Sequence, residues 1–131
     1  MPEAAVKNKR RPLWYNLSLF NLPVPGLVSI MHRISGAALF LSLPWLLYLF
    51  DASLDSPERY AQAQQQLSHP LAKLVLFGLI WGYAHHFSAG IRHLLLDVHV
   101  GIDLHSARGS ARAVLGVGVA LALLFGWVLL W

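Results

Sequence analysis

The sequence contains no cysteine and few charged residues. Without cysteine the chain can form no disulfide, hold no cysteine-ligated iron–sulfur cluster and use no thiolate nucleophile. Charged side chains make up 12% of the 131 residues and hydrophobic ones 56%, whereas about a quarter of the residues of a soluble domain are charged. This composition indicates that lipid is the main solvent. Any redox chemistry then depends on histidine or on a partner.

The few basic side chains are unevenly placed. Four of the ten lie in one short run before the first apolar segment: Lys7, Lys9, Arg10 and Arg11. A basic cluster can bind nucleic acid, but directly before an apolar segment it is typical of the cytoplasmic flank of a membrane span. We therefore expect membrane lipid, and no nucleic acid, as a partner.

Three long apolar stretches cover residues 27–50, 71–96 and 113–131. Each is close to the roughly 20 residues that a helix needs to cross the hydrocarbon core. They predict an all-α integral membrane protein whose transmembrane domain, 27–131, has three transmembrane helices. Residues 1–26 form a cytoplasmic N-terminal segment, in which 13–20 is too short to span and is expected to lie at the membrane interface.

Two features of these spans bear on packing. Pro44 removes a hydrogen bond inside the first span, which bundled membrane helices tolerate. Gly116, Gly118 and nearby alanines predict a close helix contact in the third span.

The flanking charges predict the orientation. Arg92, Arg108 and Arg112 are expected on the same side as the N-terminal basic run, whereas the first loop, 51–70, is mainly acidic. Because Lys and Arg concentrate on the cytoplasmic side, the N-terminus is expected in the cytoplasm and the C-terminus in the periplasm of a bacterial inner membrane.

Polar side chains inside the first two spans form two clusters. In the first span Ser29, His32 and Arg33 lie three and four residues apart, which places them on one helix face. In the second span the shared face carries His86, Gly90, His93 and Asp97, with His85 and Arg92 beside it. The two spans run in opposite directions, so the clusters can meet, with His86 roughly 10 Å deeper than His93.

Ionisable residues within a span usually mark a cavity, a ligand or a pathway. A buried imidazole, a glycine one turn away and cations nearer the cytoplasm suit a haem, its axial ligand and its propionates. Three other interpretations remain open, namely histidines that only pack, a proton relay and a transported-ion site. Zinc is disfavoured because no set of His and carboxylate residues has local zinc-site spacing.

Two motifs resemble those of one known family, the cytochrome b subunit of succinate dehydrogenase. The first, S-x-x-H-R-x-[ST]-G, is matched by residues 29–36, and the second, H-x-x-x-G-x-R-H, by residues 86–93 followed by Asp97. An opening Arg-Pro-Leu at 11–13 also matches. The resemblance extends over nearly the whole chain and its three-span plan.

The resemblance implies specific roles. His86 is the axial ligand of a haem b and so binds its iron, with His32, Arg33, Arg92 and His93 around the haem propionates. Ser29 and Arg33 line a ubiquinone site. A second small three-span subunit supplies the other haem ligand, while a flavoprotein subunit holds FAD and an iron-sulfur subunit holds the iron-sulfur clusters.

By the same resemblance the chain couples succinate oxidation in its partners to quinone reduction, as a subunit of succinate dehydrogenase that catalyses nothing alone and has no catalytic residue. Two alternatives stay open. One is the anchor of a fumarate reductase, because the buried motifs do not determine whether the complex oxidises succinate or reduces fumarate. The other is a structural or transport membrane protein that binds no haem.

Overall fold

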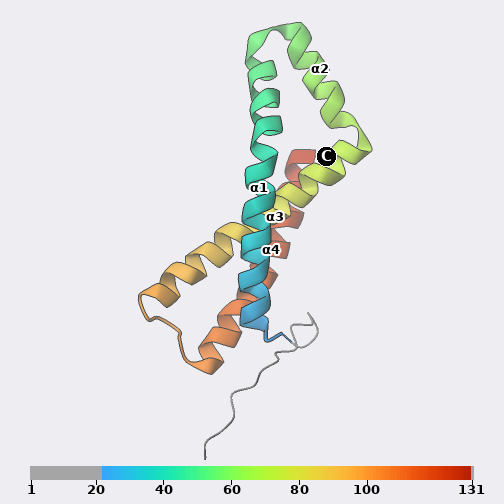
Figure 1. The fold of residues 1–131 in the computed structure, drawn as a ribbon. Helices are drawn as coiled ribbons and strands as arrows, with labels where there is room; N and C mark the ends of the chain where they lie inside the picture. The colour runs from blue at the N-terminus through green and yellow to red at the C-terminus, as the bar shows by residue number, and fades with distance from the viewer. Residues whose placement is uncertain (1–21, 131) are drawn as a thin grey trace, which may run out of the picture.

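The computed structural model describes residues 22–130, which form four helices and contain no strand (Figure 1). In chain order these are α1, Val24–Asp55; α2, Pro57–Ser68; α3, Pro70–Asp97; and α4, Leu104–Leu130. Helices α1, α3 and α4 are long and apolar enough to cross a membrane. The prediction of an all-α protein with three spans is therefore confirmed. The interfacial segment predicted at 13–20 lies outside the described residues.

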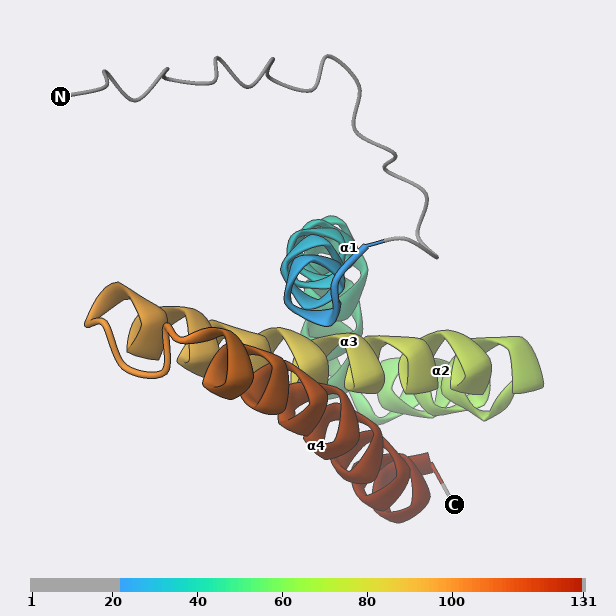
Figure 2. The same cartoon turned by 90° about the horizontal axis from the view of Figure 1, so that it is seen from below.

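Helix α3 lies between α1 and α4 and contacts both (Figure 2). α3 and α4 run antiparallel, since the Nζ of Lys73 at the start of α3 donates to the carbonyl of Leu130 at the end of α4, 2.8 Å away. The start of α1, the end of α3 and the start of α4 lie toward one end of the bundle (Figure 1). Polar residues near these helix ends are thus brought to a similar level.

The helices extend beyond the apolar stretches that predicted them. α1 covers 24–55 rather than 27–50, and α4 begins at Leu104 rather than at residue 113. Asp103 precedes α4, and its Oδ1 accepts from the Ser106 N–H at 2.9 Å. Hydrogen bonds from the Ser106 side chain and then from its backbone N–H lower the pKa of Asp103. Hydropathy marks where the lipid begins, whereas a capping side chain marks where the helix begins.

The segment 51–70, expected as a loop, mostly forms α2. The Ser56 Oγ accepts from the Arg59 N–H at 3.2 Å, Pro57 occupies the first turn, and Glu58 lies near the positive end of the helix dipole. These are ordinary helix-start signals in a polar sequence. α2 returns the chain from the end of α1 to the start of α3.

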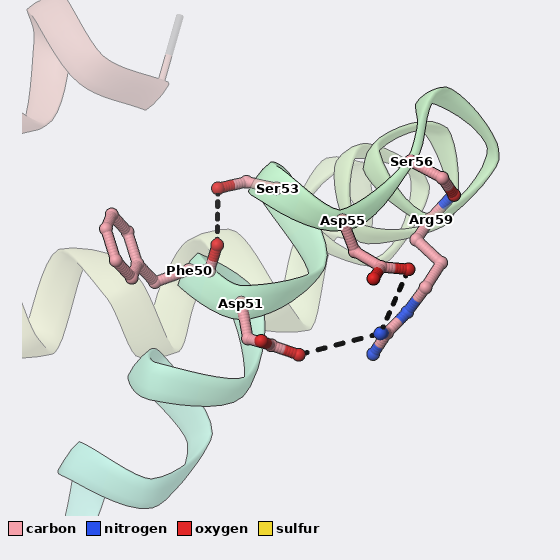
Figure 3. A network of polar contacts seen from close by, with 6 residues as sticks. All are labelled: Phe50, Asp51, Ser53, Asp55, Ser56 and Arg59. Carbon is pink, nitrogen blue, oxygen red and sulfur yellow. Dashed lines mark hydrogen bonds and ion pairs between the residues drawn. The ribbon is translucent and has the colours of Figure 1, made fainter.

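An ion-pair network holds the corner between α1 and α2 (Figure 3). The Arg59 Nη1 lies 3.3 Å from an Asp55 carboxylate oxygen and 3.5 Å from one of Asp51. The hydrogen bond and charge of Asp55 raise the pKa of Arg59. The guanidinium, which is charged in any case, offsets the two carboxylates. The opposite end of the bundle is basic, because Arg108 and Arg112 lie exposed there near the start of α4.

Small residues bring the three long helices together. Val28 of α1, Ala89 of α3, and Ala111 and Val114 of α4 form one buried cluster. A Cβ built at Gly118 would lie 3.4 Å from the His85 Cα, whereas one at Gly116 would meet nothing within 4 Å. Of the two glycines singled out in the sequence, Gly118 carries the close contact.

We expect Gly118→Val to push α4 away from α3, with a cost of roughly 1–3 kcal/mol for overpacking. The measurement is the midpoint of thermal unfolding in detergent. Gly116→Val is the matched control, since it adds the same side chain to the same helix in open space. Equal shifts in the two variants would contradict this account of the contact.

Candidate functional site

The polar side chains of α3 divide between its two neighbours. Arg92 turns toward α4, His86 and His93 turn toward α1, and His85 is buried where α3 meets both neighbours, with its Cα against Gly118 of α4 and its imidazole near the backbone of Val28 of α1. Successive helical residues point about 100° apart, so the neighbouring histidines have different surroundings. The two faces therefore have to be described separately.

On the α1 side, His86 is held by hydrogen bonding and stacking. Its Nδ1 lies 3.0 Å from the His32 carbonyl oxygen, and the two imidazole rings stack 4.1 Å apart with an interplanar angle of 6°. The His93 ring lies 5.0 Å from that of His32 at a tilt of 54°. The sequence prediction that the clusters of the first two spans can meet is correct for these three histidines.

This geometry determines the tautomer of His86. A carbonyl oxygen can only accept, so the Nδ1 that faces it carries the proton. The lone pair of the neutral ring is then on Nε2. Among residues 22–130 no hydrogen bond to that nitrogen is formed. His86 thus offers a free Nε2 in a half-buried position.

Two glycines leave space for these rings. A Cβ at Gly36 would lie 2.8 Å from the Cε1 of His86, closer than packed atoms approach, and one at Gly90 would lie 3.6 Å from the Nε2 of His32. Gly36 is therefore needed for the observed position of the His86 ring. Gly90 leaves room between α3 and α1.

Ser29 and Arg33 lie on α1 close to the histidines but outside their ring contacts. Ser29 is half-buried and Arg33 is exposed. Neither side chain forms a hydrogen bond or an ion pair with another described residue. Both remain available to a ligand or to another subunit.

His85 is buried between α1, α3 and α4. Its side chain is 1% exposed, its Cα lies against Gly118, and its ring stacks on Trp81 at 5.6 Å. Its Nε2 is buried, with no hydrogen-bond partner in the described part of the chain. His85 and His86 therefore both hold a free ring nitrogen, in very different surroundings.

Arg92 contacts α4. It is 6% exposed, and its Nε donates to the Ser110 Oγ at 3.0 Å and its Nη2 to the Ala107 carbonyl at 3.2 Å. The expectation from sequence grouped Arg92 with His93 around one ligand, but the structure directs the guanidinium to the other interface. The sequence spacing indicated that Arg92 and His86 lie on different faces of the helix, because Arg92 lies seven residues after His85 and so shares the face of His85. Asp97 is exposed at the end of α3.

Within residues 22–130 no three His, Asp or Glu side chains converge in a way that could hold a metal ion. The histidines of the α1 side stack instead of pointing at a common centre. A metal bound through His86 would need its remaining ligands from a cofactor or from another chain.

The family model that describes the succinate dehydrogenase/fumarate reductase transmembrane subunit matches residues 7–125. The succinate dehydrogenase cytochrome b556 subunit of Paracoccus denitrificans is 33% identical over 121 residues, which cover 92% of this chain and 93% of the relative. The subunit of the same name from Coxiella burnetii is 34% identical over 123 residues, covering 92% and 98%. The mitochondrial cytochrome b560 subunit of Dictyostelium discoideum is 26% identical over 124 residues, covering 94% and 65%.

The fold and the histidines at its helix crossing define a multi-pass membrane protein that presents an ionisable site within a helical bundle. The chain belongs to the succinate dehydrogenase/fumarate reductase transmembrane subunit family. It is a membrane-anchor subunit of an enzyme complex of this type, and the resemblance stated from its motifs is confirmed.

The contacts of Arg92 generate a prediction about stability. Arg92→Leu removes the hydrogen bonds that a buried guanidinium donates to Ser110 and Ala107 of α4, at a cost of roughly 1–3 kcal/mol. The unfolding midpoint of the purified complex should fall. Arg108→Leu, at an exposed position of α4, should change it little. If both variants unfold at the native midpoint, Arg92 does not join α3 to α4 in the assembled protein.

Proposed function

We propose that this chain is the cytochrome b anchor of a succinate dehydrogenase, with His86 as one axial ligand of a haem b and with Ser29 and Arg33 in a ubiquinone site. The names of its relatives, cytochrome b556 and cytochrome b560 subunits, support a haem b. The observation that carries the ligand assignment is the different packing of the two adjacent histidines.

His85 and His86 both have a ring nitrogen available, so the room around each ring decides between them. His85 is enclosed, with its Cα against Gly118 of α4 and its imidazole near the backbone of Val28 of α1, and a flat macrocycle at its buried Nε2 would have to separate packed helices. His86 is half-buried beside Gly36, on the side of α3 that faces α1. These surroundings favour His86 and give His85 a place in the helix core.

The described residues fit the proposed cofactor. Bound haem b supplies a one-electron carrier. The proton on Nδ1 of His86 fixes the ring as a neutral imidazole that donates through Nε2. His32 and His93 lie beside this ring, where hydrogen bonds to propionates would stabilise the bound group. Arg33 could also donate hydrogen bonds to the propionates, whereas Arg92 would first have to break its hydrogen bonds to α4.

The quinone site rests on Ser29 and Arg33. A hydroxyl can donate to a quinone oxygen, and a guanidinium can stabilise the negative charge that develops there during reduction. The exposure of Arg33 and its lack of a partner among the described residues support this role.

The proposal requires partners. A second small three-span subunit provides the other haem ligand, and the low burial of α1 within this chain leaves surface for it. FAD and the iron-sulfur clusters belong to a flavoprotein and an iron-sulfur subunit that dock on the cytoplasmic face. The basic end of the bundle, with Arg33, Arg108 and Arg112, supports a cytoplasmic N-terminus and a periplasmic C-terminus in the bacterial inner membrane.

The first test compares His86→Ala with His85→Ala in the intact complex, by reduced-minus-oxidised visible spectra and haem content. We expect His86→Ala to lose or alter the low-spin haem b signal, because it removes an iron ligand. His85→Ala should retain that signal in whatever fraction assembles. The opposite pattern would move the ligand to His85. A colourless native complex would favour the interpretation in which these histidines bind no cofactor.

The second test concerns Arg33. Arg33→Leu should lower the rate of quinone reduction about 100-fold, the usual loss when one donor that stabilises a developing charge is removed. The haem spectrum should persist, since His86 keeps its contacts. Turnover is measured with a quinone acceptor and, as control, with an artificial acceptor that bypasses the membrane site. Equal loss of haem and turnover would make Arg33 structural.

The family also includes fumarate reductase anchors. The residues described here do not set the direction of electron flow, which depends on partner clusters and quinone potential. Comparing succinate oxidation with fumarate reduction by the same preparation distinguishes the two enzymes.

A further inference from the structure

Ser35 of α1 occupies a position that the ligand assignment leaves unused. Its side chain is buried, with 5% exposed, inside the contact between α1 and α3. The Ser35 Oγ donates to the His32 carbonyl at 3.0 Å and lies 3.4 Å from the Nδ1 of His86. That same carbonyl accepts from His86 Nδ1 at 3.0 Å. A hydroxyl, an imidazole and a backbone carbonyl thus meet at one point.

The proton positions follow from the chemistry of the three groups. The carbonyl accepts from both partners, so the hydroxyl proton of Ser35 points at it. The lone pairs of the Ser35 Oγ are then left facing the Nδ1–H of His86. The imidazole proton is shared between a strong acceptor, the carbonyl, and a weaker one, the hydroxyl oxygen.

We propose that Ser35 is a positioning residue for His86. It holds the carbonyl that orients the ring, and it adds a second acceptor on Nδ1–H. An acceptor on the distal nitrogen of an imidazole fixes the tautomer and raises the basicity of the other nitrogen. Ser35 therefore tunes how strongly Nε2 donates to a bound metal. This inference rests on the proposed role of His86 as a haem ligand.

α1 offers a matched control. Ser42 makes the same kind of hydrogen bond, from its Oγ to the carbonyl three residues earlier, Leu39, at 2.7 Å. It forms no hydrogen bond with His86 or any other described residue of α3. Ser35→Ala and Ser42→Ala therefore delete equivalent local bonds in one helix, and only the first deletion reaches His86.

The experiment measures haem content, the electron paramagnetic resonance spectrum of the oxidised haem and its midpoint potential in the purified complex. We expect Ser35→Ala to bind haem about tenfold more weakly, the lower end of the effect of losing such an outer partner. The midpoint potential should rise, because weaker donation from Nε2 stabilises the oxidised iron less. If the whole tenfold loss of affinity falls on the oxidised haem, the rise is about 59 mV for this one-electron couple. Ser42→Ala should match the native complex in all three measurements.

A second pair keeps the test decisive if Ser35→Ala assembles poorly. Ser35→Thr retains the hydroxyl, and Ser35→Val has nearly the same shape without it. Thr should keep the native potential and Val should raise it.

The inference is overturned if Ser35→Ala or Ser35→Val leaves the spectrum and the potential of the haem native, or if Ser42→Ala changes them equally. Failure of the proposed function looks different. In that case the native complex lacks haem b, or His86→Ala retains the native haem signal.

Discussion

The site depends on the position of α3 between α1 and α4. Adjacent residues of a helix that contacts two neighbours diverge by about 100° and so meet different surroundings. Because Gly118 lets α4 approach the backbone of His85 closely and Gly36 makes room for the ring of His86, His85 is enclosed among the helices and His86 is half-buried between α3 and α1. His85 and His86 are adjacent in the sequence, yet the first is a buried packing group and the second is a half-buried ring with a free Nε2.

The same arrangement explains why this chain serves as one part of a larger complex. The histidines of the α1 side stack and tilt against one another, and no three potential ligands converge within residues 22–130. A single imidazole positioned by a neighbouring backbone carbonyl would supply one ligand of the proposed haem. α1 also remains the least buried of the three long helices. The uncovered surface of α1 is available to another subunit of the complex.

Much of this could be predicted from the sequence, because each successful prediction rests on a local pattern. Three apolar stretches gave three spans, and spacings of three and four residues brought Ser29, His32 and Arg33 to neighbouring positions on α1. Hydropathy could not give the helix ends, since Ser56 and Asp103 begin helices in polar sequence. The direction of Arg92 needed the position of α4, which no local pattern contains. Nor could the sequence reveal that Ser35 and His86, 51 residues apart, share one carbonyl.

A density map of the intact complex with its haem tests the central claim most directly. The account predicts continuous density between the haem iron and the Nε2 of His86, with Nδ1 on the His32 carbonyl and the His85 ring enclosed among α1, α3 and α4, away from the haem. Iron bonded to His85, or a His86 ring turned away from α1 and from the haem, would contradict the division of α3 into a core face and a site face.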